Sequence, residues 1–502
     1  MASESTSPAP AGGAVLAVTC VSALVVNANT SAVTILLPAI SHDVGASATT
    51  LQWAVTGYSL VGAAVIVTGG ALGDIAGRRR VFSGALLLFV LSCVVVGLAG
   101  SGAAVIAGRA IQGAAGSTLL ACGLSLLSVA ASGTAQVRAV SLWGAASAVG
   151  AAAGPLAGGL LVDTTGWQGL FWIDAAIAAA CIPLTLATVP ESRDETRPRS
   201  LDLAGMLLVA ACLVPLVLAL SRGSDWGWLS APTWTCLIVS AAAGWGFAAV
   251  ERRVRAPLVD LRLLRNKVLV GSTLVILIVA GAINGLMYVM SLFFQDPAAF
   301  AMSPLQAGLA TLPAAAGIVL IAPFVGSLAK KIGSRSVIVL GFAITTGGFV
   351  ALVFLEESWG YGVFVLPLVA VAAGMGLSNG CASAAATSSV PANDVGGASG
   401  ISNMARYVGA ALLTAVTATI YGGAASIEGA NRGAALVDGV ARTALLMAIV
   451  SGAGVALGLL YGRYRPGPAR PGGPTSAAAG VVHSVPVPAP ADTDRTTSVD
   501  LE

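Results

Sequence analysis

The chain is a succession of long apolar runs separated by short polar segments. About fourteen of these runs are long enough to cross the roughly 30 Å hydrocarbon core of a membrane as helices. They lie near residues 14–38, 51–72, 81–99, 103–128, 137–161, 168–189, 202–221, 232–250, 268–294, 304–328, 337–355, 361–386, 397–421 and 439–461. The pattern therefore predicts an all-α integral membrane protein with fourteen transmembrane helices.

Polar segments flank the apolar region on both sides. Residues 1–13 lack the basic start of a signal peptide, so we expect a cytoplasmic tail before an uncleaved first span. Residues 462–502 are rich in Pro, Gly, Ala and Ser, which predicts a disordered cytoplasmic tail.

The composition supports a membrane protein and excludes several other classes. Hydrophobic residues make up 56% of the chain and charged residues only 9%, against roughly a quarter charged residues in a soluble domain. The net charge of +3 is too small to indicate nucleic-acid binding. We expect the lipid bilayer to be the solvent of this chain.

Arginine and lysine residues gather on alternate loops of the fourteen-span map. Sixteen lie in one set of loops and four more in the tail that follows, whereas three lie in the opposite set. Because basic residues favour the cytoplasmic side, we expect a multi-pass protein of the cell (plasma) membrane with both termini in the cytoplasm. The same bias places the polar segment 70–81 in the cytoplasm.

Segment 70–81 has a degenerate second copy at 326–337. Gly70 then matches Gly326, and Arg79 matches Arg335. The first copy follows the second span and the second copy follows the tenth, which indicates a duplicated transporter. The predicted units are a six-helix bundle at 14–189, two inserted transmembrane helices at 202–250, a cytoplasmic linker at 251–267 and a second six-helix bundle at 268–461. The linker alternates cationic and apolar residues, which suits either an interfacial segment or a solvated connection.

No set of residues assembles a catalytic, metal or nucleotide site. The seven cysteines are scattered through apolar runs without metal-ligand spacing, and there are only two histidines. The nucleophile-elbow pattern at 376–380 lies in an apolar span, and the glycine pair at 108–113 lacks the Lys-Ser/Thr of a phosphate loop. We therefore expect no enzyme, no metal and no cofactor, with energy supplied by an ion gradient or a partner.

Several motifs, taken in order, resemble those of a known transporter family. Segments 70–79, 105–113 and 150–159 resemble the loop, fourth-span and fifth-span signatures of the major facilitator superfamily. Segments 51–58, 255–262 and 303–313 are similar to its fourteen-span drug:proton antiporter branch. The resemblance implies two six-helix bundles that rock about a shared cavity, and export of hydrophobic or cationic drugs or antibiotics in exchange for protons. The alternatives are a uniporter, an exporter of an endogenous lipid or metabolite, and a non-transporting membrane sensor.

The polar segment after the second span is the candidate latch. The resemblance implies that Asp74 meets the N-terminal dipole of span thirteen when the cytoplasmic side is shut. The other candidate latch residues in this segment are Gly70, Gly77, Arg78 and Arg79. Ile75 stands where the family usually has a basic residue, which predicts a weaker latch.

The candidate proton-coupling residues lie in spans four, six and nine. An arginine inside span four, Arg109, is costly to bury and should face a partner, with Gln112 one turn on. Asn29 stands where the resemblance predicts an acid, and an amide cannot carry the proton. We therefore expect the titrating acid to be Asp174 or Asp296, while a water-exposed interfacial position remains the alternative for Asp174.

A four-residue spacing of glycines marks the fifth span. Gly150, Gly154 and Gly158 form a smooth helix face, and Pro155 can bend the helix. Close packing of this face is expected in any membrane bundle, and the resemblance implies that it packs against the second half and controls gating.

Aromatic, amide and basic residues in several spans are the candidate cavity lining, together with Asn29. They are Trp53, Tyr58, Asn284, Tyr288, Gln295, Asn403 and Arg406. Trp53 is also a candidate for the aromatic belt at the membrane surface. The expected partners are an amphipathic small molecule, protons and lipid, without nucleic acid, and we expect a monomer.

Overall fold

The computed structural model describes residues 11–461 except 131–132, 194–201, 255–256, 392–393, 428 and 430. The tail at 462–502, most of the tail at 1–13 and two residues of the linker therefore lie outside the described part. Within it, fourteen helices are long and apolar enough to cross a membrane. This number agrees with the fourteen apolar runs of the sequence, and the helices extend several residues beyond many of them.

The first bundle contains α1 (Ala11–Val44), α2 (Ala48–Ala76), α3 (Arg78–Gly97), α4 (Gly102–Ala130), α5 (Gly133–Thr165) and α6 (Gln168–Thr188). The inserted pair is α7 (Leu203–Trp226) and α8 (Ala231–Glu251), and the linker carries one short helix, η1 (Leu263–Arg265). The second bundle contains α9 (Lys267–Gln295), α10 (Pro304–Ile332), α11 (Ser334–Val353), α12 (Tyr361–Ser388), α13 (Val395–Ala425) and α14 (Arg432–Tyr461). The prediction of two six-helix bundles with two extra helices is confirmed.

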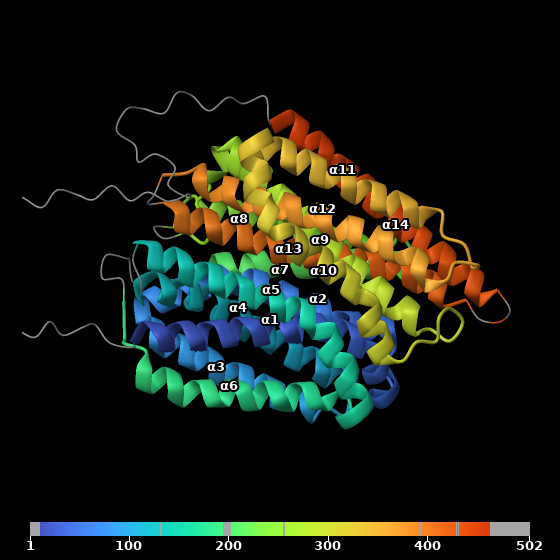
Figure 1. The fold of residues 1–502 in the computed structure, drawn as a ribbon, viewed down its shortest axis with the longest axis horizontal. Coiled ribbons are helices and arrows are strands. Elements are labelled where there is room, and N and C mark those ends of the chain that lie inside the picture. Colours follow the sequence, from blue (N-terminus) through green and yellow to red (C-terminus); the bar gives the residue numbers. More distant parts are fainter. Residues whose placement is uncertain are drawn as a thin grey trace, which may run out of the picture. The chain divides into compact units, whose positions relative to one another are not determined.

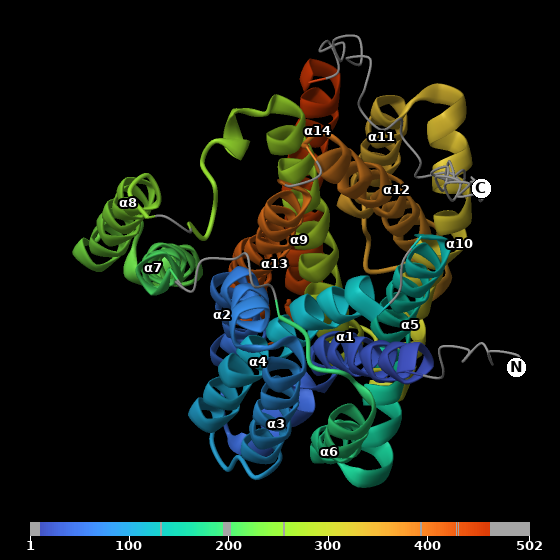
Figure 2. The same cartoon turned by 90° about the vertical axis from the view of Figure 1, so that its left-hand side faces the viewer.

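Helix packing follows the same plan in both bundles when each helix of the first is matched to the helix eight places later. In the first bundle α1 packs on α5, α2 on α4, and α3 on α6; in the second, α9 packs on α13, α10 on α12, and α11 on α14. The bundles meet through α2 with α13 and α5 with α10, which are equivalent pairs, and through α1 with α9. Figures 1 and 2 show the blue-to-teal helices of the first bundle beside the yellow-to-red helices of the second.

A single glycine joins the second and third helices of each bundle. Gly77 has φ 115° between α2 and α3, and Gly333 has φ 84° between α10 and α11. Residues that carry a Cβ rarely adopt these backbone angles, whereas glycine does so at little cost. The two copies of the sequence motif thus build the same sharp turn.

The inserted helices attach to the outside of the contact between the bundles. α7 packs on α8 and also contacts α2 and α13, as Figure 2 shows on its left-hand side. Gln52 of α2 donates to the Ser221 hydroxyl at 3.1 Å, and Thr419 of α13 donates to the Leu220 carbonyl at 3.2 Å. The inserted pair is therefore hydrogen-bonded to one helix of each bundle, α2 of the first and α13 of the second.

Two buried carboxylates fix the linker to this helix pair. Asp202 caps α7 by accepting from the Gly205 amide at 2.6 Å, and it also accepts from the Leu258 amide at 3.4 Å. Glu251, at the end of α8, accepts from the Val259 amide at 3.4 Å. Leu258 and Val259 are buried in an apolar cluster shared with helices α2, α7 and α13. This part of the linker is therefore packed protein rather than a solvated connection.

Candidate functional site

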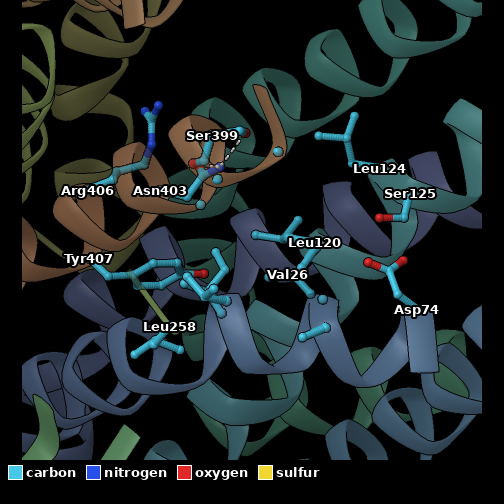
Figure 3. A pocket seen from close by; sticks show the side chains of 18 of the residues that line it. Val26, Asp74, Leu120, Leu124, Ser125, Leu258, Ser399, Asn403, Arg406 and Tyr407 are labelled. Atoms are coloured by element: carbon cyan, nitrogen blue, oxygen red, sulfur yellow. Dashed lines mark hydrogen bonds between the residues drawn. The ribbon is translucent and has the colours of Figure 1, made fainter. Parts of the chain in front are cut away.

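A cavity of about 860 Å³ lies between the bundles. Helices α1, α2, α4, α5, α9 and α13, the first residue of α3 and the linker contribute to its wall. It reaches the end of the bundles that carries the α2–α3 turn, where its lining includes Asp74, Arg78, Asp260 and the first residues of α13. In Figure 3 apolar Val26 and Leu120 lie on the first-bundle side, with Asn403, Arg406 and Tyr407 on α13.

Direct contacts between the bundles cross the opposite end. Ser291 of α9 donates to the Thr34 carbonyl of α1 at 2.6 Å, and Gln295 donates to the Ile35 carbonyl at 3.2 Å. The backbones of α5 and α10 touch as well, because a Cβ added to Gly308 would lie 2.5 Å from the Pro155 carbonyl oxygen. The cavity is therefore closed at one end and continues to the other.

Behind the cavity wall, Arg109 of α4 is buried in a network of neutral partners. Only 1% of it is exposed. Its guanidinium donates to the Ala54 carbonyl at 3.2 Å and to the side-chain oxygens of Asn29 and Gln112. It also lies 4.5 Å from the centre of the Tyr58 ring, which is within range of a cation–π interaction. These contacts offset part of the cost of holding an arginine away from water.

Asn29 connects this arginine to a carboxylate. Its amide oxygen accepts from Arg109, and its amide nitrogen donates to Asp174 of α6 at 2.7 Å. Asp174 is only 4% exposed, so the alternative of a water-exposed interfacial residue is wrong for it. The three side chains form a chain of cation, amide and anion across α4, α1 and α6.

Tyr58 separates this network from the cavity. The side chain is 2% exposed, yet the residue belongs to the cavity lining, while Arg109 sits against its ring. Tyr407 of α13 approaches Tyr58 from the second bundle, with ring centroids 6.5 Å apart. Tyr58 therefore contacts the network on one side and Tyr407 of the opposite bundle on the other.

The candidate latch lies at the mouth of the cavity. Asp74 pairs with Arg78, one turn along the chain, at 2.8 Å. Residues 395–397, the first turn of α13, line the same mouth. The latch role of Asp74 and Gly70 stays a prediction.

The cationic turn has an acidic partner that the sequence analysis missed. Glu191, just after α6, accepts from the Arg79 amide at 3.1 Å and lies 3.6 Å from the Arg80 guanidinium. A Cβ on Gly77 would lie 2.7 Å from the same carboxylate. An acid directly after the sixth apolar run was the only signal in the sequence, and nothing there indicated its distance from the turn.

The structure separates Asp296 from the network around Arg109. It pairs instead with Arg432 of α14 at 2.8 Å, at the adjoining ends of α9 and α14. Of the two candidate acids, only Asp174 is joined to Arg109 through Asn29.

The candidate cavity residues divide into two groups. Tyr58, Asn284, Asn403 and Arg406 line the cavity. The others are absent from its lining: Asn29 lies in the network, Trp53 packs against an apolar cluster of α2, α7 and α13, Tyr288 is buried in the core and Gln295 helps close the opposite end.

The glycine face of α5 packs differently from the expectation. Added Cβ atoms would meet Leu24 at Gly150, Ala28 and Ser31 at Gly154, and Ala32 at Gly158, all residues of α1. The expectation that this face packs against the second bundle is therefore wrong. The neighbouring face does so, because a Cβ on Gly159 would lie 2.5 Å from the Pro304 carbonyl of α10.

Comparison with known proteins assigns the family. A sequence profile described as Major Facilitator Superfamily matches residues 19–414. The chain is 29% identical over 396 residues to the tetracenomycin C resistance and export protein of Streptomyces glaucescens, covering 79% of this chain and 73% of that protein. It is 31% identical over 389 residues to the multidrug resistance protein Stp of Mycobacterium tuberculosis, covering 77% and 72%. An auto inhibited POT family peptide transporter has the same fold, with a TM-score of 0.64 at 16% identity over 92% of this chain and 98% of that one. A membrane-spanning chain with this profile, this fold and a cavity between two repeated bundles is a transporter rather than an enzyme, and it belongs to the Major Facilitator Superfamily.

Proposed function

We propose that this protein exports amphipathic drugs or antibiotics by alternating access, in exchange for protons. The observation that carries the proposal is the cavity between the bundles, continuous to one end and closed by direct bundle contacts at the other. The names of the relatives, which are an export protein and a multidrug resistance protein, support the same activity.

The helix contacts support a rocking motion of whole bundles. α2 with α13 and α5 with α10 are equivalent pairs in the duplicated plan. In this conformation α5 and α10 touch through their backbones at the closed end. Motion of one bundle about the other would separate this pair and bring the mouth residues near Asp74 together with the start of α13.

In this proposal Asp174 carries the proton. Its carboxylate accepts from Asn29, which also holds the Arg109 guanidinium. Protonation of Asp174 would remove the negative end of this chain and leave Arg109 as an uncompensated charge behind Tyr58. The network and the cavity would then respond to each other through the Tyr58 ring, which is how proton uptake and substrate release could be linked.

The proposal places the protein in the plasma membrane as a monomer. The α2–α3 turn carries Arg78, Arg79 and Arg80, and basic residues favour the cytoplasmic side. The open end of the cavity would then face the cytoplasm, which is the side from which an exporter collects its substrate.

The test uses the full chain reconstituted in liposomes that enclose a pH-sensitive dye. Addition of a transported drug should produce proton movement in the direction opposite to the drug, and Asp174→Asn should abolish it. Asp438→Asn is the matched control, because Asp438 is an exposed acid of α14 outside the cavity lining. Drug movement without proton movement would identify a uniporter, and the absence of both across compound classes would favour a sensor.

A further inference from the structure

Arg406 is a cavity arginine without an acidic partner among the described residues. Its one hydrogen bond is a donation to the side-chain oxygen of Asn379 of α12, at 3.3 Å. An ion pair would satisfy such a group better, because a neutral amide does not compensate a positive charge. The side chain is partly exposed and lies in the lining of the cavity.

The other charges of the lining are already neutralised. Asp74 pairs with Arg78 at 2.8 Å, and both lie in the lining. Asp260 pairs with Arg262 at 2.8 Å. The described wall of the cavity therefore carries one uncompensated positive charge, that of Arg406.

The start of α13 lies at the mouth of the same cavity, where residues 395–397 belong to the lining. Arg406 follows eleven residues after Val395 on the same helix, about 16 Å along its axis. The charge of Arg406 therefore lies deeper in the cavity than the mouth residues.

Polar and apolar groups are arranged for an amphipathic molecule around this charge. Ser399 and Asn403 lie along α13 between the mouth and Arg406. The Asn403 side-chain amide donates to the Ser399 carbonyl at 3.0 Å. Figure 3 shows them in a row with Arg406, while Val26 and Leu120 of the first bundle offer apolar contact on the other side. An aromatic or aliphatic body could lie against these apolar residues with its charged group at Arg406.

We propose that the preferred substrates are amphipathic organic anions, and that Arg406 is the residue that selects their negative charge. A carboxylate fits this residue best, because the guanidinium offers planar, two-point hydrogen bonding to that group. The inference rests on the proposed export function and gives its substrate class.

The experiment compares two dyes that share a xanthene skeleton. Fluorescein is an anion with a free carboxylate, whereas rhodamine 123 is a cation whose carboxylate is esterified. Binding of each dye to the purified full chain in lipid nanodiscs is followed by fluorescence polarisation. Wild type should bind fluorescein more tightly, and Arg406→Gln should weaken fluorescein binding about tenfold or more while leaving rhodamine 123 unchanged or tighter.

Two further variants separate charge recognition from folding. Arg406→Lys keeps the charge and should retain part of the fluorescein affinity. Arg442→Gln removes an exposed arginine of α14 that is paired with Asp438 outside the cavity lining, and it should behave as wild type. If Arg406→Gln lowers the binding of both dyes equally, or of neither, or if wild type fails to bind fluorescein, the inference is overturned.

Transport is measured separately, so that the two failures are distinguishable. In vesicles under an imposed pH gradient, wild type should move fluorescein, and Arg406→Gln should not. If wild type moves no compound of any class although fluorescein binding depends on Arg406, the export function fails and the anion selectivity of the cavity stands.

Discussion

Arg79 and Arg335 make the same contact in the two bundles. Arg79 donates to the Val189 carbonyl at the end of α6, at 3.3 Å, and Arg335 donates to the Gly458 and Leu459 carbonyls in the last turn of α14, at 3.2 and 2.7 Å. Each arginine follows the sharp glycine turn and reaches the C-terminus of the sixth helix of its bundle. The C-terminal end of a helix leaves backbone carbonyls unsatisfied and carries partial negative charge, so a guanidinium is favourable there.

Removal of these arginines should therefore loosen the attachment of the third helix to the sixth. We expect Arg335→Ala to cost about 0.5–1.5 kcal/mol for each of the two hydrogen bonds that it removes, the net value of a typical hydrogen bond. Arg79→Ala should also lower the stability, because it removes the contact with the Val189 carbonyl and leaves Glu191, 3.9 Å away, without this cation. Thermal unfolding of purified protein in detergent measures both, and equal melting temperatures for wild type and Arg79→Ala would contradict the assignment.

Asn29→Ala tests the bridge between Arg109 and Asp174. The substitution leaves one buried donor and one buried acceptor without their shared partner, at a cost of about 1–3 kcal/mol for each group. We expect a lower melting temperature and a loss of proton-linked export. Thr19→Val serves as the control, because Thr19 is a buried polar residue of the same helix that lies outside the cavity lining and donates to the Val15 and Leu16 carbonyls of its own helix. Unchanged coupling in Asn29→Ala would show that the bridge is not needed.

Gly150→Ala and Gly159→Ala should separate folding from gating. The new methyl group at position 150 would meet the Leu24 carbonyl inside the first bundle, so we expect destabilisation of about 1–3 kcal/mol. At position 159 it would meet Pro304 across the closed end, so we expect a shift toward the conformation in which that end is open.

Thermal unfolding measures the destabilisation expected for Gly150→Ala. Distances between spin labels on α5 and α10 measure the opening expected for Gly159→Ala. A shared result for the two variants, whether both unfold or both stay closed, would reject this division of roles between adjacent glycine faces.

Asp202→Ala should release the linker from the inserted helices. It removes the cap of α7, at a cost of about 0.5–2 kcal/mol, and one of the acceptors that hold the Leu258 amide. Hydrogen exchange of the backbone amides of residues 258–260 should become faster. Asp202→Asn keeps an acceptor for the Gly205 amide and should be closer to wild type, so identical exchange in both variants would show that the cap does not control the linker.

The architecture could be predicted from the sequence because membrane insertion constrains the length of each apolar run and the charge of each loop. The apolar runs predicted the positions of the helices. The repeated segment predicted which helices of the two bundles are equivalent, since Gly77 and Gly333 build the same turn. Asp174 and Arg109 could be nominated because intramembrane charges are costly and need partners.

Other parts of the site depend on tertiary neighbours that no pattern reveals. The four-residue spacing of Gly150 and Gly154 indicates a smooth face, but it does not say whether α1 or α10 packs against it. Glu191 and the Asp202 cap are single acids next to helix ends, so only the fold shows which amides and cations they reach. Substrate selectivity at Arg406 depends on the absence of a nearby carboxylate in the described wall, which sequence spacing cannot establish.

The attachment of α7 and α8 has a consequence for the history of the fold. α8 packs mainly on α7, and the two six-helix bundles meet through helices that need neither of them. The hairpin could therefore have been acquired by, or deleted from, a twelve-helix ancestor without rebuilding the central pathway. Because α7 contacts α2 on one side and α13 on the other, any relative motion of the two bundles has to be accommodated at the hydrogen bonds that join α7 to these helices.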